Sequence, residues 1–213
     1  MKVEGQVGPQ VVQDGAFNEF RLGKTGEQVV VELHGKYYEQ TYRGNVYHAA
    51  QTAGVILPAP AATANNVMTL ANPAGSGKNL ALISFDMVFT TINATPATGL
   101  YGLYVNTNVA AAAVTGTAVT AIPGLVGTNY QPAGKALSTS TLPAAPTLFW
   151  PFGFKETGGV VTAVPITGLP SFHIDFDGTV VLTPGTAITP QLGTADTTNG
   201  TVICTFRWEE VAP

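Results

Sequence analysis

Residues 171–209, SFHIDFDGTVVLTPGTAITPQLGTADTTNGTVICTFRWE, decide the fold. Four short stretches in this segment are rich in apolar and β-branched residues with strand-like alternation: Ser171–Phe176, Thr179–Leu182, Ala187–Leu192 and Thr201–Glu209. They are separated by dipeptides typical of turns, namely Asp177-Gly178, Pro184-Gly185 and Asn199-Gly200. Short strands at this spacing predict an antiparallel sandwich or barrel.

The same pattern is found upstream. Asn79–Thr91 is the clearest single strand, and its predicted core face consists of Ala81, Ile83, Phe85, Met87 and Phe89. Its opposite face, expected to be wetter, carries Ser84, Asp86 and Thr90. Further strands are expected at Val67–Ala71 and Leu100–Asn106, and Thr147–Lys155 is expected to be an aromatic-rich strand or bend. The sequence shows no convincing long helix, so we expect an all-β fold.

Composition supports an all-β fold with an unusually neutral surface. Apolar residues make up 45% of the 213 residues and charged residues only 10%, against about 25% charged in an average globular chain. The many Thr, Gly (24) and Pro (15) residues favour strands and turns over helices. Because burial between neighbours is the usual reason for exposed apolar area, we expect an assembly subunit rather than a free monomer.

Net charge and hydropathy weigh against two classes of partner. The formal charge of −4, without any basic run, gives no electrostatic reason to expect nucleic-acid binding. No segment approaches transmembrane length, and the first residues, MKVEGQVG, lack the apolar stretch of a signal peptide. We therefore expect a soluble protein that binds neither nucleic acid nor membrane.

Charge is concentrated near the N-terminus, which predicts two parts. Residues 1–50 hold half of the charged side chains and are expected to form an arm or small β subdomain. Within it, Gln28–Leu33 and Lys36–Tyr42 flank His34-Gly35 and predict a hairpin. Residues 51–66, rich in Pro and Ala, are expected to be a linker, and residues 67–213 the sandwich. The linker gives the arm reach, so we expect the arm to mediate attachment.

The single cysteine, Cys204, excludes an intrachain disulfide. It alternates with apolar residues on one strand face, which indicates a buried and inert thiol. Together with the face described above, this strand supplies the predicted core: Ile83, Phe85, Met87, Phe89, Val202, Cys204, Phe206 and Trp208.

A search for catalytic and nucleotide-binding motifs finds no convincing match. Asn72–Asn79 (NPAGSGKN) contains GSGK, but Asn72 stands where a phosphate loop has Gly, and Asn79 where it has Ser or Thr. A glycine-rich turn into the following strand is the favoured interpretation. Gly75-Ser76-Gly77 is too short for a nucleophile elbow. Glu209 and Glu210 alternate to opposite faces, which is poor geometry for a glycosidase.

Metal-binding and modification motifs are equally weak. The three histidines, His34, His48 and His173, are not at ligand spacing from one another. His173 and Asp175 share a strand face and could form a metal or acid–base pair, although a solvated strand edge is the simpler interpretation. Two sequons, Asn93-Ala94-Thr95 and Asn199-Gly200-Thr201, mean little without a signal peptide. The sequence thus predicts no enzyme and no catalytic, cofactor-binding or metal site.

Three segments resemble parts of a known family. Asp177–Thr183 (DGTVVLT) with Pro184-Gly185, and Gly200–Glu210 (GTVICTFRWEE), resemble the last strands of small virion proteins of tailed bacteriophages. Asn72–Leu82 (NPAGSGKNLAL) is similar to a strand entry in the same proteins. These are capsid decoration or cement proteins with a jelly-roll-like β-sandwich, often trimeric and without catalytic residues.

The resemblance implies a non-enzymatic structural protein on the virion capsid surface, made in the host cytoplasm. Its expected partners are the major capsid protein and copies of itself in a homotrimer. The aromatic residues that one small sandwich would not bury alone agree with such association: Phe149, Trp150, Phe152 and Phe154.

Two other classes of function remain open. A receptor- or glycan-binding head of a tail fibre or spike could stack sugars on exposed aromatic residues, with core packing the simpler interpretation for most of them: Tyr101, Tyr104, Tyr130, Phe149 and Trp150. A hydrolytic enzyme would need a site that the sequence does not show.

Overall fold

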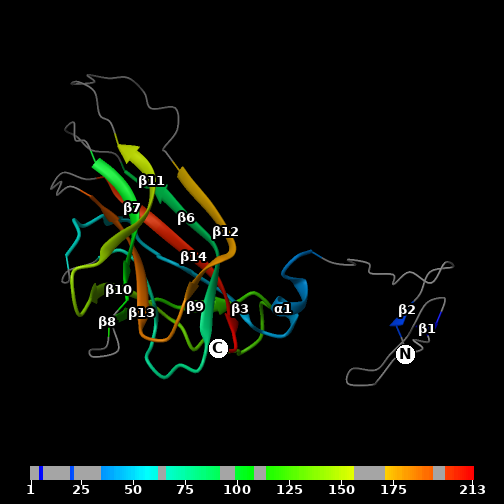
Figure 1. The fold of residues 1–213 in the computed structure, drawn as a ribbon. Coiled ribbons are helices and arrows are strands. Elements are labelled where there is room, and N and C mark those ends of the chain that lie inside the picture. The colour runs from blue at the N-terminus through cyan, green and yellow to red at the C-terminus, as the bar shows by residue number, and fades with distance from the viewer. Residues whose placement is uncertain are drawn as a thin grey trace. The chain divides into compact units, whose positions relative to one another are not determined.

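The computed structural model describes residues 5–6, 20–21, 35–61, 66–91, 99–107, 114–155, 171–193 and 200–213. The chain divides into two compact units, residues 1–38 and 39–213. In the first unit, β1 (Gly5–Gln6) and β2 (Phe20–Arg21) form a two-stranded parallel pair. The second unit begins with the short helix α1 (Tyr38–Tyr42), whose first residue lies at the division, and continues into a sandwich of two sheets (Figure 1).

We name each sheet after a central strand. The β14 sheet has the order β12 (Ser171–Leu182), β6 (Asn79–Phe89), β14 (Thr201–Val211), β3 (Val46–Ala50) and β9 (Ala121–Pro123), and β4 (Val55–Ile56) also pairs with β14. The β13 sheet has the order β11 (Thr147–Lys155), β7 (Gly99–Asn106), β13 (Thr186–Leu192), β5 (Thr69–Asn72), β10 (Lys135–Thr141) and β8 (Thr115–Ala118). All strand pairs within these two sheets are antiparallel.

Eight strands pair as a set of nested hairpins, which defines a jelly roll. In chain order, the first strand of the eight pairs with the last (β3 with β14), the second with the seventh (β5 with β13), the third with the sixth (β6 with β12) and the fourth with the fifth (β7 with β11). Two sheets of four result, β3-β14-β6-β12 and β5-β13-β7-β11. The extra strands β8, β9 and β10 follow β7 and widen both sheets. The expected all-β, jelly-roll-like sandwich is confirmed.

The inner faces of the two sheets form one aromatic-rich core. Seven of the eight predicted core residues belong to this core and are at most 5% exposed; Ile83, the eighth, is 3% exposed but is not part of the cluster. Phe85 packs on Phe206 with ring centroids 4.9 Å apart. Phe152 and Phe172, from the neighbouring edge strands β11 and β12, extend this packing through contacts with Tyr101. Burial of these side chains supplies most of the free energy that favours folding.

A bulge in β6 corrects one sequence-based face assignment. Arg207 pairs with Ser84 and Trp208 with Leu82, so Ile83 is an extra residue in β6. The alternation therefore shifts, and Leu82, fully buried, faces the core where Ala81 had been expected. Ser84, expected on the wetter face, is only 1% exposed.

The predicted hairpin in the N-terminal arm is wrong in its second strand. Lys36–Tyr42 is not extended, because Tyr38–Tyr42 forms α1, in which Glu39 and Arg43 make an ion pair of 2.7 Å one turn apart. A short run with alternating polar and aromatic residues does not distinguish strand from helix by period alone. The first predicted strand, Gln28–Leu33, lies outside the described residues.

The predicted boundaries of arm and linker also need correction. β3 belongs to the sandwich, since it pairs with β14 along its whole length. Residues 51–61 of the expected linker contain β4, and Leu57 is 3% exposed within the core. The sandwich therefore begins before residue 50 rather than at residue 67; residues 62–65 lie outside the described part of the chain.

Candidate functional site

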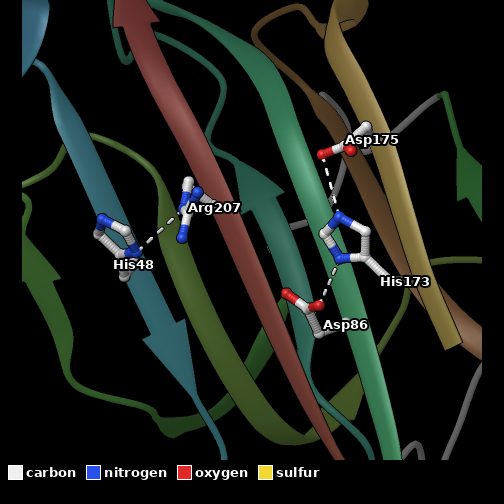
Figure 2. A network of polar contacts seen from close by, with 5 residues as sticks. All are labelled: His48, Asp86, His173, Asp175 and Arg207. Carbon is white, nitrogen blue, oxygen red and sulfur yellow. Dashed lines mark hydrogen bonds and ion pairs between the residues drawn. The ribbon is translucent and has the colours of Figure 1, made fainter. Parts of the chain in front are cut away.

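A charged network lies on the outer face of the β14 sheet (Figure 2). His173 on β12 contacts Asp86 on β6, with 2.6 Å between His173 Nδ1 and Asp86 Oδ1. The other ring nitrogen, Nε2, lies 3.1 Å from Oδ1 of Asp175. The antiparallel register places His173 directly opposite Asp86, and Asp175 shares the outer face because it lies two residues along the same strand.

Both carboxylates favour the protonated imidazolium of His173. Its pKa is raised from the usual value, first by the hydrogen bond with Asp86 and then by the hydrogen bond with Asp175. Only the protonated ring carries a proton on both nitrogens, so only this form donates to both carboxylates at once. All three side chains are well exposed, which limits the strength of each ion pair.

A second pair lies on the adjacent strands of the same face. Arg207 on β14 is opposite His48 on β3. The Nε–H group of Arg207 donates a hydrogen bond to Nδ1 of His48, and the two nitrogen atoms are 3.3 Å apart. The pKa of His48 is lowered, mainly because partial burial disfavours its charged form and also because of the nearby Arg207 charge. His48 is thus an acceptor and the guanidinium is the cation of this pair.

The sequence predicted only part of this face. It placed His173 and Asp175 together, but the third member, Asp86, is 87 residues away and joins them only through the pairing of β12 with β6. The Arg207–His48 pair was missed because it likewise depends on strand pairing across the sheet. Over the described ranges, no group of three or more His, Cys, Asp or Glu side chains has the arrangement of a metal site.

The GSGK segment is a turn, as expected. Gly75 and Gly77 have φ angles of 78° and 66°, and the chain enters β6 directly at Asn79. The side-chain amide of the buried Asn72 donates to the carbonyl oxygens of Lys78 and Leu182, with an N–O distance of 2.8 Å in each case. These two hydrogen bonds connect the turn to the end of β12. These contacts explain the segment without a phosphate.

Glu209 and Glu210 point to opposite faces of β14, as predicted. The Glu210 carboxylate is 5% exposed and accepts hydrogen bonds from the backbone N–H groups of Ala133 and Gly134 and from the indole N–H of Trp208. The pKa of Glu209, on the outer side, is raised by partial burial. Glu210 is therefore occupied in holding the loop before β10.

An aromatic patch lies on the edge strand β11. Leu148, Phe149 and Trp150 are consecutive and are 40%, 45% and 41% exposed. The Trp150 ring packs edge-on against the buried ring of Phe176 on β12, with ring centroids 5.8 Å apart. This contact with the core restricts the orientation of the Trp150 side chain. We call these three residues the β11 patch.

The backbone of β11 is poorly suited to pairing with another strand. The β7–β11 register shifts twice, between Leu148 and Trp150 and between Pro151 and Gly153, and Pro151 has no N–H to donate. Bulges and proline are the usual protection of an exposed sheet edge. The β11 patch therefore presents side chains rather than a template for strand addition.

The other aromatic residues considered as sugar platforms divide between core and surface. Tyr101 and Tyr104 are 3% and 5% exposed and belong to the interior, whereas Tyr130 is 45% exposed. Phe152 is partly buried in the edge cluster, and the side chain of Phe154 lies outside the described residues. Of the five aromatic residues considered for sugar binding, Tyr101 and Tyr104 therefore serve in core packing, and the other three are exposed.

Cys204 is fully buried, and burial raises the pKa of its thiol well above the usual value, as expected for an inert structural cysteine. His34 and the first sequon lie outside the described residues, as does Asn199 of the second. Among the described residues, no helix is both long and apolar enough to span a membrane.

Comparison of the chain with protein-family models, with curated proteins and with solved structures gives no match. Fold and site geometry alone therefore define its class: a jelly-roll sandwich with an exposed aromatic edge and a charged outer sheet face.

Proposed function

We propose that the protein is a non-enzymatic structural subunit of a tailed-phage virion, a capsid decoration protein that binds and stabilises the head. The observation that carries the proposal is the β11 patch. Three consecutive exposed apolar side chains are unfavourable in a free soluble protein and usually have an interaction role. The capsid as the target follows from the resemblance of the last strands to cement proteins.

The patch has the features of an interface anchor. Trp150 is held by Phe176, so little side-chain entropy is lost when a partner covers it. Buried aromatic residues contribute disproportionately to binding at interfaces. The low charge of the chain also keeps small the cost of desolvating its surface against the major capsid protein.

The titratable groups support a structural role over acid–base catalysis. Both ring nitrogens of His173 contact carboxylates, so neither is free to act on a third group. The buried Glu210 carboxylate already accepts three hydrogen bonds from protein donors. A general base needs an accessible lone pair within hydrogen-bond reach of its substrate.

The remaining parts of the proposal follow from the same resemblance. The protein is located on the outer capsid surface and associates with copies of itself, as a homotrimer in the family it resembles. The N-terminal arm adds a second attachment point, and its boundary is best taken at the division between the two compact units rather than at residue 50.

A glycan-binding head is the second candidate, because exposed Phe149 and Trp150 on a fixed support are also suitable for stacking on sugar rings. The same variants separate the two functions. Trp150→Ala and Phe149→Ala remove the patch, and Val126→Ala, at an 81% exposed apolar position elsewhere, is the matched control.

The test is co-sedimentation with phage heads assembled from the major capsid protein alone. We expect wild-type protein and the Val126→Ala variant to bind alike, and Trp150→Ala to bind about tenfold or more weakly, the effect of losing an interface anchor. Equal binding by Trp150→Ala removes the patch from the proposal. No binding to heads, with Trp150-dependent binding to an oligosaccharide array, would establish the glycan-binding alternative.

A further inference from the structure

The outer face of the β14 sheet has ordered rows of side chains across its strands. The register places Asp175, Ser84, Arg207, His48 and Ile122 in one row, running from β12 to β9. A neighbouring row contains His173, Asp86, Thr205 and Ala50. Val88 and Ile122, at 46% and 52% exposure, and Val181, at 46%, lie on this same face. The face thus combines exposed apolar side chains with a few charges in fixed positions.

The charges of this face are separated into two halves. On β12 and β6, two carboxylates share one histidine, so this half keeps negative charge even when His173 is protonated. On β14 and β3, Arg207 has His48 as its acceptor, and no carboxylate of the described residues lies within ion-pair distance of its guanidinium. The terminal amino groups of Arg207 are thus available for a carboxylate from outside (Figure 2).

We propose that this face pairs with the same face of a second copy, with Arg207 of each copy binding Asp175 of the other. Asp175 and Arg207 lie in one row, on the two strands that flank Ser84 of β6. A two-fold axis running in the interface plane along β6 therefore places each Arg207 over the partner's Asp175. Such a reciprocal contact is isologous, the arrangement of most symmetric dimers.

The position of the axis limits the contact to the three longest strands of the sheet. The strands β6 and β14 have 11 residues each and β12 has 12. With about 4.8 Å between strands and about 3.3 Å per residue, these three alone form a face of about 14 Å by 36 Å. An axis along β6 places these three strands over the same three strands of the partner, whereas β3 and β9 lie beyond the partner's edge strand β12. The contact is therefore smaller than the roughly 800 Å² that each partner buries in a standard stable interface, so we expect the association to depend on protein concentration.

The other charges of the face are compatible with this contact. Asp86 lies on β6, along which the two-fold axis runs, so it faces Asp86 of the second copy. Each Asp86 is paired with His173 of its own copy, and this pairing offsets the repulsion between the two carboxylates. Glu209 lies in the row of Val181 and Ala81, close to the end of the sheet, where an interface is hydrated. The pairing also leaves the β11 patch on the other sheet uncovered, and two-fold and three-fold axes coexist in dihedral assemblies.

Charge reversal with measurement of the molar mass by light scattering tests the proposal. Wild-type protein is expected at an even multiple of the 22.0 kDa chain mass. Arg207→Glu and Asp175→Arg each create like-charged pairs across the axis and should halve that mass. The double variant, and an equimolar mixture of the two single variants, restore opposite pairs and should restore the mass. Lys135→Glu on β10 of the other sheet is the control and should change nothing.

Each result decides the matter. A monomeric or trimeric wild type at high micromolar concentration overturns the pairing, as does a mass unchanged by either reversal. Loss of association in a single variant without recovery in the double variant overturns the specific Arg207–Asp175 contact. Circular dichroism of each variant confirms that the sandwich is folded in the samples compared.

Discussion

The Glu210 carboxylate accepts a 2.8 Å hydrogen bond from the backbone N–H of Gly134, 76 residues earlier in the chain. The same carboxylate also binds the N–H of Ala133 and the indole of Trp208. One buried side chain near the end of the last strand therefore satisfies three donors and joins β14 to the loop before β10. Charge-assisted hydrogen bonds of this kind are stronger than neutral ones.

Replacing Glu210 by Ala should destabilise the sandwich by about 2–4 kcal/mol, because buried donors lose their acceptor and a cavity remains. Urea unfolding measures the change, and Glu209→Ala, the neighbour on the outer face, is the control with an expected loss below about 1 kcal/mol. Equal losses for the two variants would contradict the assigned role of Glu210.

His173 and His48 should titrate on opposite sides of the ordinary histidine value of 6.5. Carboxylate hydrogen bonds raise the pKa of His173, while burial and Arg207 lower that of His48. NMR titration of the ring protons, assigned with His173→Gln and His48→Gln, measures both. Asp86→Asn should lower the His173 pKa more than Asp175→Asn does, since Asp86 is the larger cause.

This shift has a consequence for stability. Because the folded-state pKa of His173 exceeds the unfolded value, its contribution is fully present below about pH 6.5 and is lost as the pH rises through the folded pKa. Thermal unfolding of wild type and His173→Gln should therefore converge at alkaline pH. A difference between them that grows with pH would reject this account of the network.

Cys204 should react with a thiol reagent only when the protein unfolds. It is fully buried between Val202 and Phe206 on the inner face of β14, and burial raises its pKa. Phe206→Ala should cost about 3–5 kcal/mol and accelerate labelling. Fast labelling of native wild-type protein would show that this part of the core is open.

The two compact units predict the outcome of truncation. Deleting residues 1–34 leaves α1 and all sandwich strands, so the product should fold and lose its attachment to the particle if the arm mediates it. Deleting residues 1–50 also removes β3, which pairs with β14 through five residue pairs, and should leave the sandwich unfolded or aggregated. Full particle binding by the shorter deletion would exclude the arm as the attachment point.

Strands were predicted correctly from the sequence where their local residue pattern was strong. Strands bounded by Gly and Pro turns, such as Ala187–Leu192 and Thr201–Glu209, were predicted to within two residues of their observed limits, because side-chain alternation and turn residues are local signals. Ser171–Phe176 and Thr179–Leu182, expected as two strands, form the single strand β12, whose pairing with β6 shifts register between Asp175 and Val180. Lys36–Tyr42 was misassigned because seven residues fit either period. The bulge at Ile83 was not visible, since a bulge depends on the partner strand rather than on local sequence.

The functional faces were harder to predict because they are assembled across strands. Asp86 and His173 come together only once β6 is paired with β12, and Arg207 and His48 only once β14 is paired with β3. The sequence did show aromatic residues near Trp150. It could not show that Trp150 stays at the surface while Tyr101 and Tyr104 are buried, which depends on the edge position of β11.

Electron cryo-microscopy of phage heads, assembled from the major capsid protein and then incubated with this protein, tests the central claim most directly. The account predicts extra density on the outer surface at symmetric joints between capsid subunits, into which the jelly-roll sandwich fits with the β11 patch facing the head. Heads that remain undecorated at saturating concentrations of folded protein would contradict a decoration role.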